Sequence, residues 1–353
     1  MLTETCALGC RAAGDRCARF EPTNGLGPAL HDAASHPTVT LASGTTIDAD
    51  TGVVLDQHGM PMTVASVIVT QSGTLPIRVF EASTFDLSDV RINGTYAVAF
   101  VAAGDIAIHG VVSVKGRSGA SGPGAQMSPA ACAAIGGQEY AAGCGPGSVG
   151  TGGGGNSTSG GIGGGTLGTT GITGAPGTAN VGFTPLLGGC PGGSQLDLNG
   201  GNYSFGGGGG GAIQFVSNSS IAIQSSGYVD VGGGGGGSSA GGGSGGVIIF
   251  ESPALLVQNP GGFAANGGAG GGCSTFGADG GPGTTPALGP SCSDFYGGPG
   301  GTGYAAAGNA CTGGTCSAHG DCTPHFGGGG GSVGRVRIGV ISAATTVTLL
   351  ELE

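Results

Sequence analysis

Glycine supplies 87 of the 353 residues, about a quarter of the chain, against about 7% in an average protein. Because each internal glycine weakens a helix or strand by about 1 kcal/mol, this composition excludes an ordinary helical or doubly wound enzyme. Only 8% of the residues are charged and the net charge is −11. Nucleic acids and anionic membranes are therefore excluded as partners, since both require a dense basic surface. Glycine occurs in runs such as 206–211, which also excludes collagen.

The first 37 residues form a cysteine-containing segment before the first predicted strand. Residues 1–5 have neither the basic start nor the apolar core of a secretory signal, so we expect the export signal to lie upstream. No run of the chain approaches the 18 to 20 apolar residues that a membrane-spanning helix needs. We therefore predict no transmembrane segment.

A unit of three short strands in about 20 residues, ending in glycine, recurs from residue 77 onward. Copies begin at Ile77, Ala97, Ala212 and Val247, and the start of another follows Gly334. This order places Phe100, Phe215 and Phe250 at equivalent positions. It predicts an all-β fold, a short parallel β-helix (a solenoid with three strands per coil), as a single domain over residues 38–350. An antiparallel sandwich or meander is the alternative, because it also has short strands separated by turns.

Glycine is concentrated in three insertions of this domain, at 116–211, 232–246 and 267–333, which together hold 71 of the 87 glycines. Each insertion follows the third strand of a repeat, so we expect all three to leave the fold at one corner. Such a composition is typical of disorder. The alternative is packing as polyproline-II strands, whose backbones can approach closely and bond to one another where side chains are missing.

Cysteine usage favours the packed alternative and an oxidising compartment. If the eight cysteines of the insertions all pair, the odd numbers in the first and third insertions require at least one bridge between them. The disulfide candidates are Cys6, Cys10, Cys17, Cys132, Cys144, Cys190, Cys273, Cys292, Cys311, Cys316 and Cys322.

Residues that could carry chemistry are sparse. The insertions contain only six charged residues, and acid–base catalysis needs at least a pair of titratable groups, so we predict neither an enzyme nor a cofactor. Cys316, His319, Cys322 and His325 follow one another at intervals of three. They would share one side of a threefold strand and could bind a soft metal, although disulfides beside exposed histidines explain them as well. The candidates for surface contact are aromatic: Tyr203, Phe205, Tyr296 and Tyr304.

The N-terminal cysteine spacing, the segment 20–28 and the glycine runs followed by strands together carry a resemblance. The chain resembles uncharacterised glycine-rich, cysteine-containing hypothetical secreted proteins or lipoproteins of Gram-negative soil bacteria. That resemblance implies export and surface display, and it brings no catalytic residue with it.

These observations predict an extracellular or outer-surface protein with a structural or adhesive role. Stacked strands with uncovered ends favour self-association into a matrix or filaments. The alternative function is binding or degradation of a carbohydrate, with a surface polysaccharide as the partner.

Overall fold

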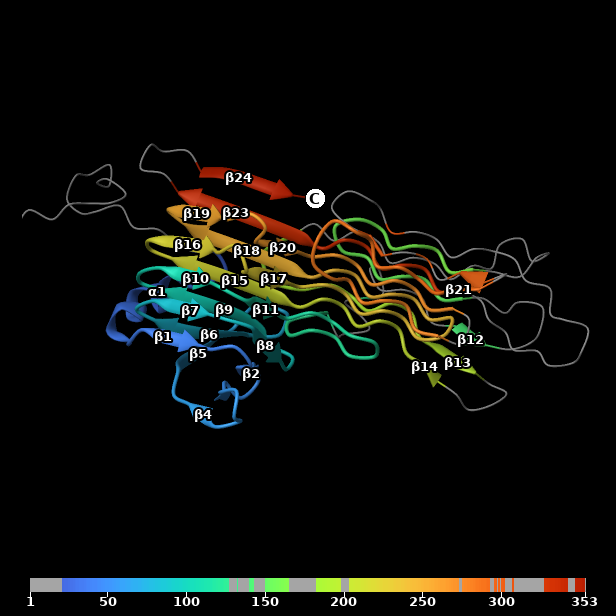
Figure 1. Cartoon of the computed structure of the whole chain (residues 1–353), viewed down its shortest axis with the longest axis horizontal. Coiled ribbons are helices and arrows are strands. Elements are labelled where there is room, and N and C mark those ends of the chain that lie inside the picture. Colours follow the sequence, from blue (N-terminus) through green and yellow to red (C-terminus); the bar gives the residue numbers. More distant parts are fainter. Residues whose placement is uncertain are drawn as a thin grey trace, which may run out of the picture.

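The computed structural model describes residues 21–126, 132, 140–142, 150–164, 182–197, 203–272, 275–292, 295, 296, 298, 300, 301, 307, 327–341 and 347–352. Within these residues the regular secondary structure is almost entirely strands, which form three large sheets and two small ones. Figure 1 shows the large sheets gathered at one end of the molecule, with the glycine-rich runs extending away from them. The three large sheets and the helix beside them are called the sheet body below.

Sheet 1 has five strands, and every neighbouring pair is parallel. Its strands are short, and their outermost members are β1 and β19. In spatial order they are β1 (Val39–Leu41), β7 (Phe85–Leu87), β10 (Ile106–Ile108), β16 (Ser220–Ile223) and β19 (Ala254–Val257).

Sheet 2 has seven strands and is mixed. The pairs from β20 to β2 are parallel, whereas β2–β3 and β3–β4 are antiparallel. In spatial order the strands are β20 (Gly262–Ala264), β17 (Tyr228–Asp230), β11 (Val111–Ser113), β8 (Val90–Asn93), β2 (Thr46–Asp48), β3 (Val54–Leu55) and β4 (Pro61–Met62).

Sheet 3 also has seven strands and is mixed, with an antiparallel pair at each end, β23–β24 and β5–β6. The pairs between them are parallel. In spatial order the strands are β24 (Val347–Leu352), β23 (Arg335–Ile341), β18 (Val247–Ser252), β15 (Ala212–Ser217), β9 (Ala97–Ala102), β6 (Ile77–Ala82) and β5 (Ala65–Val69).

The prediction of a short parallel β-helix, a solenoid with three strands per coil over residues 38–350, is wrong. Two of the three large sheets are mixed, and all three are open sheets with two outer strands each. Strands β3, β4, β5 and β24, which make the antiparallel pairs, lie outside the three-strand repeat on which the prediction was based. They are joined to their neighbours by short connections, which turn the chain back and make antiparallel pairs.

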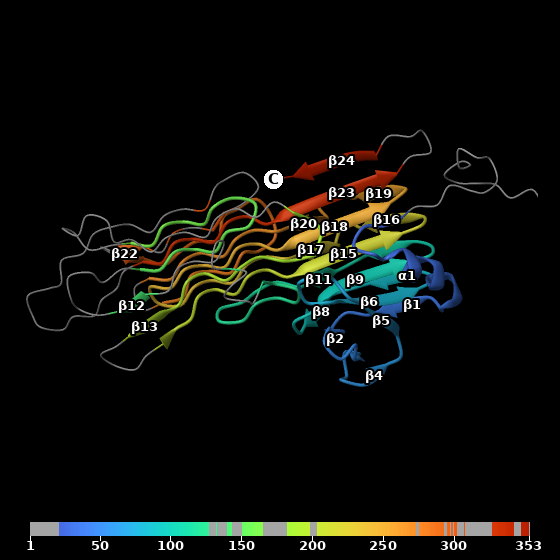
Figure 2. The same ribbon diagram turned by 180° about the vertical axis from the view of Figure 1, so that it is seen from behind.

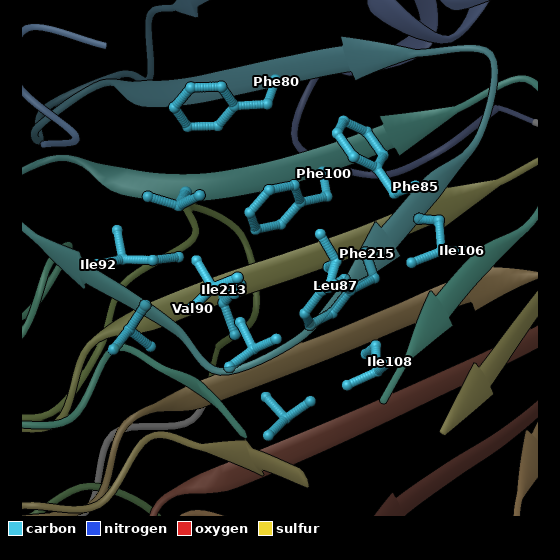
Figure 3. Packing of buried hydrophobic residues seen from close by; sticks show 14 of the residues in the cluster. Phe80, Phe85, Leu87, Val90, Ile92, Phe100, Ile106, Ile108, Ile213 and Phe215 are labelled. Atoms are coloured by element: carbon cyan, nitrogen blue, oxygen red, sulfur yellow. The ribbon is translucent and has the colours of Figure 1, made fainter. Parts of the chain in front are cut away.

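The repeat nevertheless has the register that its sequence alignment indicates. Phe100 pairs with Phe80 on one side and with Phe215 on the other, and Phe215 pairs with Phe250. The rings of these four residues form a ladder with centroids 5.4–5.7 Å apart, and Phe85 meets Phe100 edge to face. Figure 3 shows Phe80, Phe100 and Phe215 of this ladder among aliphatic side chains from all three sheets. Each fully buried phenylalanine stabilises the fold by roughly 1.5–3 kcal/mol.

The outer face of sheet 3 is covered as well, which explains why β6, β9, β15 and β18 are buried along their whole length. Helix α1 (Gly27–Asp32) and the 3-10 turn η1 (Ala33–Ser35) lie on this face, and Leu26 and Leu30 pack against it. Pro28 stands in the first turn of α1, where a missing N–H is tolerated. The described part of the N-terminal segment therefore belongs to the sheet body.

Each glycine insertion begins after a strand of sheet 2 and ends at a strand of sheet 3. The first runs from β11 to β15, the second from β17 to β18, and the third from β20 to β23. Figures 1 and 2 show the described runs lying side by side in an extended layer. Small strands lie in this part of the chain: β12 (Tyr140–Ala142), β13 (Gln195–Asp197), β14 (Tyr203–Ser204), β21 (Ser291–Cys292) and β22 (Phe295–Tyr296). The described runs are called the glycine bundle: 116–124, 150–164, 186–194, 205–211, 231–238, 239–246, 267–272, 276–288 and 327–334.

Candidate functional site: the glycine bundle and its basic pocket

Hydrogen bonding in the glycine bundle repeats every three residues. Along residues 241–246 each backbone N–H donates to a neighbouring run, and three different runs are used in turn. The acceptors, in order, are the carbonyl oxygens of Gly193, Gly329, Gly234, Cys190, Ser332 and Val231, at 2.8–3.1 Å. A threefold period is that of polyproline-II geometry, which has no hydrogen bonds within the strand. Of the two alternatives for the insertions, the described runs adopt the packed one.

Glycine is required at the centre of the bundle because the backbones are in direct contact. A Cβ atom added to Gly243 would collide with the carbonyl oxygen of Gly208, and one added to Gly241 would collide with that of Gly152. Gly281, by contrast, has open space where a Cβ would lie. The high glycine content is therefore explained by close approach between strands at the buried positions.

The few larger residues inside the bundle bind neighbouring backbones with their side chains. The Oγ1 of Thr151 accepts the N–H of Gly241 at 2.8 Å, and the Oγ of Ser244 accepts the N–H of Cys190 at 3.0 Å. Asn156 donates through Nδ2 to Gly245 at 2.6 Å and accepts from Nε of Arg335 at 3.0 Å. These side chains connect runs that are distant in sequence, and all three are buried.

Two of the predicted disulfide candidates are bridged to each other within the described residues. Cys132 and Cys190 form a disulfide with a Cα–Cα distance of 5.8 Å. Both cysteines belong to the first insertion, so the predicted bridge between the first and third insertions stays a prediction. The side chains of the other candidates lie outside the described residues: Cys6, Cys10, Cys17, Cys144, Cys273, Cys292, Cys311, Cys316 and Cys322.

Exposed apolar side chains are found on the bundle. Phe205, a predicted contact residue, is 54% exposed, and sequence analysis missed Phe276 and Leu288, which are 66% and 68% exposed. Phe205 and Phe276 both approach Gly237, which brings the first and third insertions together on one side of the second. Their position on a strand-free, glycine-rich segment carries no periodic signal, so only the fold identifies them.

The remaining aromatic and metal candidates are not tested by the structure. Tyr203 lies in β14 and Tyr296 in β22, but their side chains, like the whole of Tyr304, fall outside the described residues. Cys316, His319, Cys322 and His325 also lie outside them. Within the described part of the chain, no three His, Cys, Asp or Glu side chains come close enough to hold a metal ion.

A pocket of about 220 Å³ lies where sheet 2 meets the bundle. Three cationic side chains line it: Arg91 from β8, and Lys115 and Arg117 from the chain just after β11. Arg91 stands beside Ser113 in the parallel pair β8–β11, which brings the two parts of the chain together. This basic pocket is lined by residues 91–94, 113, 115, 117 and 120–123.

The basic pocket was missed from the sequence because the chain has so few cations. The same scarcity led us to exclude nucleic acids and anionic membranes as partners. Arg91 belongs to a different repeat from Lys115 and Arg117, and only the register of sheet 2 makes them neighbours. A second, larger cavity of about 410 Å³ adjoins β20 and has no charged residue in its lining.

Carboxylates of the sheet body serve mainly as hydrogen-bond acceptors. The Ser43 hydroxyl donates to Asp89 at 2.7 Å and, with the backbone N–H of Val111, lowers the pKa of that carboxyl. Hydrogen bonds from Ser219 and Ser220 lower the pKa of Asp105. Asp230 differs, because burial raises the pKa of its carboxyl although the N–H of Gly232 donates to it at 2.9 Å.

Comparisons with known protein families, curated proteins and solved structures find no match to this chain. In the described residues, no helix combines the length and the apolar character that crossing a bilayer requires.

Proposed function

We propose that this chain is a secreted or cell-surface protein with a structural and adhesive role, in which the sheet body presents the glycine bundle as a stiff contact surface. The observation that carries the proposal is the threefold hydrogen bonding of residues 241–246 to three neighbouring runs. A strand fixed on three sides by backbone bonds is constrained along its whole length. Such a segment can present fixed side chains without a conventional hydrophobic core.

The composition of the bundle surface supports adhesion. Phe276 and Leu288 expose about two thirds of their side chains, and the insertions contain only six charged residues. A weakly charged surface with exposed apolar groups loses little solvation of charge when it is covered by another surface. The disulfide between Cys132 and Cys190 supports an oxidising, extracellular environment.

The outer strands of sheet 1 support self-association. Among the described residues, β1 and β19 have a hydrogen-bonded neighbour on one side only. Such an outer strand offers its free backbone groups to a strand of another molecule. Pairing of β19 with β1 of a second copy would continue the parallel sheet and produce a filament.

Adhesion is tested by adsorption of the purified protein to octyl-coated beads. The double variant Phe276→Ser/Leu288→Ser should bind about tenfold more weakly, because full burial of each side chain is worth roughly 1.5–3 kcal/mol. The matched control, Val67→Ser/Ile68→Ser, changes two exposed apolar residues of β5 in the sheet body and should bind like the wild type. Equal adsorption of the bundle variant and the wild type would contradict the proposed contact surface.

Self-association is tested separately by sedimentation velocity over a range of concentrations, with electron microscopy of the same samples. The proposal predicts oligomers that grow with concentration and elongated assemblies in the images. A monodisperse monomer at every concentration would exclude the filament.

A further inference from the structure

The basic pocket contains every described cation that is not used inside the fold. Six of the nine Lys and Arg residues lie in the described part of the chain. Three of them are held in internal contacts: Arg78 with the carbonyls of Ala49 and Asp50, Arg335 with Asn156 and the Phe183 ring, and Arg337 with Glu251. The other three, Arg91, Lys115 and Arg117, line the basic pocket.

The charge of the pocket is only partly compensated. Lys115 lies 3.9 Å from a carboxylate oxygen of Asp279, and an ion pair so near the surface contributes little stability. Arg91 and Arg117 are exposed to solvent. Asp230 is a second carboxylate near Lys115 and Arg117. The three cations of the pocket attract anions over the Debye length of about 8 Å at physiological salt.

The other lining residues suit a ligand that carries hydroxyl groups as well as charge. Asn93, Ser113 and Ser121 bring an amide and two hydroxyls to the same pocket, and these groups both donate and accept hydrogen bonds. A guanidinium group binds a carboxylate or sulfate with two parallel N–H donors. The pocket thus combines anion-binding and hydroxyl-binding groups in about 220 Å³.

An aromatic side chain stands beside the turn that carries Arg117. Residues 117–120 form this turn, in which the N–H of Arg117 and the N–H of Ala120 each donate to the other residue's carbonyl. The Cβ of Phe205 is 3.3 Å from where a Cβ of Gly119 would lie, and Phe205 is 54% exposed. An aromatic ring offers an apolar face on which the C–H face of a sugar ring can pack.

We infer that the basic pocket binds the anionic group, a carboxylate or a sulfate, of an acidic polysaccharide. The inference rests on the proposed surface role, because the acidic polysaccharide would be the ligand to which a secreted adhesive protein attaches. Three cations are too few to follow the phosphates of a nucleic acid, whose binding depends on many Lys and Arg contacts. A polysaccharide requires fewer charges, since its hydroxyls and its apolar sugar faces also contribute.

The test compares polymers that differ only in their charge. Polygalacturonate is paired with its methyl ester, and dextran sulfate with dextran, and binding to the purified full chain is measured by calorimetry. The charged member of at least one pair should bind, and its neutral partner should not. Stronger binding of polygalacturonate assigns the anion as carboxylate, and stronger binding of dextran sulfate assigns it as sulfate. Equal binding of charged and neutral polymers would overturn the inference.

The pocket is tested with the triple variant Arg91→Gln/Lys115→Gln/Arg117→Gln. Removing these three partly exposed charges should weaken binding of the charged polymer by about tenfold or more. The control Arg91→Lys/Arg117→Lys keeps the charge and should keep most of the binding. Unchanged thermal unfolding of both variants shows that they are folded, and the single variant Arg91→Gln replaces the triple variant if that one fails to fold. Wild-type affinity in a folded variant without these charges would overturn the assignment.

The two proposals fail in different ways. If the protein binds polygalacturonate but does not adsorb to octyl-coated beads, the adhesive surface is wrong and the pocket assignment is supported. If it adsorbs to the beads but binds none of the four polymers, the pocket assignment is wrong. The triple variant should adsorb to the beads like the wild type, because Phe276 and Leu288 are unchanged.

Discussion

The sheet body and the glycine bundle use opposite means to pack strands together. In the body, side chains fill the space between the sheets, as in the ladder from Phe80 to Phe250 with ring centroids 5.4–5.7 Å apart. In the bundle, backbones contact one another, and Gly243 has no room for a Cβ beside the carbonyl of Gly208. The comparison shows that one chain can form two ordered regions, one stabilised mainly by apolar burial and the other mainly by backbone hydrogen bonds.

The largest expected effect is in the sheet body. Phe100→Ala removes a fully buried ring that contacts Phe80, Phe85 and Phe215, and it should lower the free energy of unfolding by about 4 kcal/mol. Urea denaturation measures the change. The control Phe276→Ala, in the bundle, removes a ring that is 66% exposed and should change stability by less than about 0.5 kcal/mol. Equal effects would contradict the proposed difference between the regions.

The disulfide should matter more for the bundle than for the sheet body. Cys132→Ser/Cys190→Ser opens a loop that spans 58 residues and should cost about 2–4 kcal/mol. Amide exchange followed by mass spectrometry should accelerate in residues 186–194, whereas residues 97–102 of β9 should remain protected. Equal acceleration in both regions would show that the bridge stabilises the whole molecule evenly.

The requirement for glycine can be tested at two positions of the bundle. Gly243→Ala should destabilise the protein by about 1–3 kcal/mol, since the methyl group would push apart backbones in contact. Gly281→Ala, where nothing lies within 4 Å, should be neutral or stabilise slightly by restricting the unfolded chain. Thermal unfolding of both variants gives the comparison, and a neutral Gly243→Ala would contradict the packing.

A smaller effect is expected from Asp230, at the junction of the two regions. Burial raises the pKa of its carboxyl above the usual value of 3.8, and Lys115, Arg117 and Asp279 are the charged groups near it. The folded state then binds the proton more tightly than the unfolded state does. The stability contribution of Asp230 is therefore greatest below pH 3.8 and decreases as the pH rises through the raised pKa.

Asp230→Asn removes the cost of burying a charged carboxylate, and it keeps an oxygen that can accept the N–H of Gly232. The variant should be more stable than the wild type at pH 7, and the difference should shrink as the pH falls toward 3.8. Unfolding curves from pH 3 to pH 8 measure it. A difference that is constant over this range would contradict the raised pKa.

The sequence repeat predicts part of the sheet body correctly. The alignment of Phe100, Phe215 and Phe250 is the observed strand register, because one side chain of each copy must fill the same layer of the core. The antiparallel strands β5 and β24 could not be predicted in this way, since they have no counterpart in the repeat. The covering of sheet 3 by α1 was also missed, because six residues are too few to show a helical period.

The candidate site could be predicted only in part. The place of the glycine insertions after the strands of sheet 2 follows from the order of the repeats, and Phe205 was found as an exposed aromatic residue. Which glycine contacts which run depends on long-range packing that composition does not encode. The basic pocket likewise needs the pairing of β8 with β11 before Arg91 and Lys115 become neighbours.

The most direct test of the packed glycine bundle is the amide hydrogen exchange of residues 241–246, resolved by NMR. All six N–H groups donate to carbonyls of three neighbouring runs, and all six residues are buried. Their exchange should be orders of magnitude slower than in an unstructured peptide of the same sequence, because exchange requires the bonded strands to open. Exchange of these amides at the rate of the unstructured peptide would contradict the account.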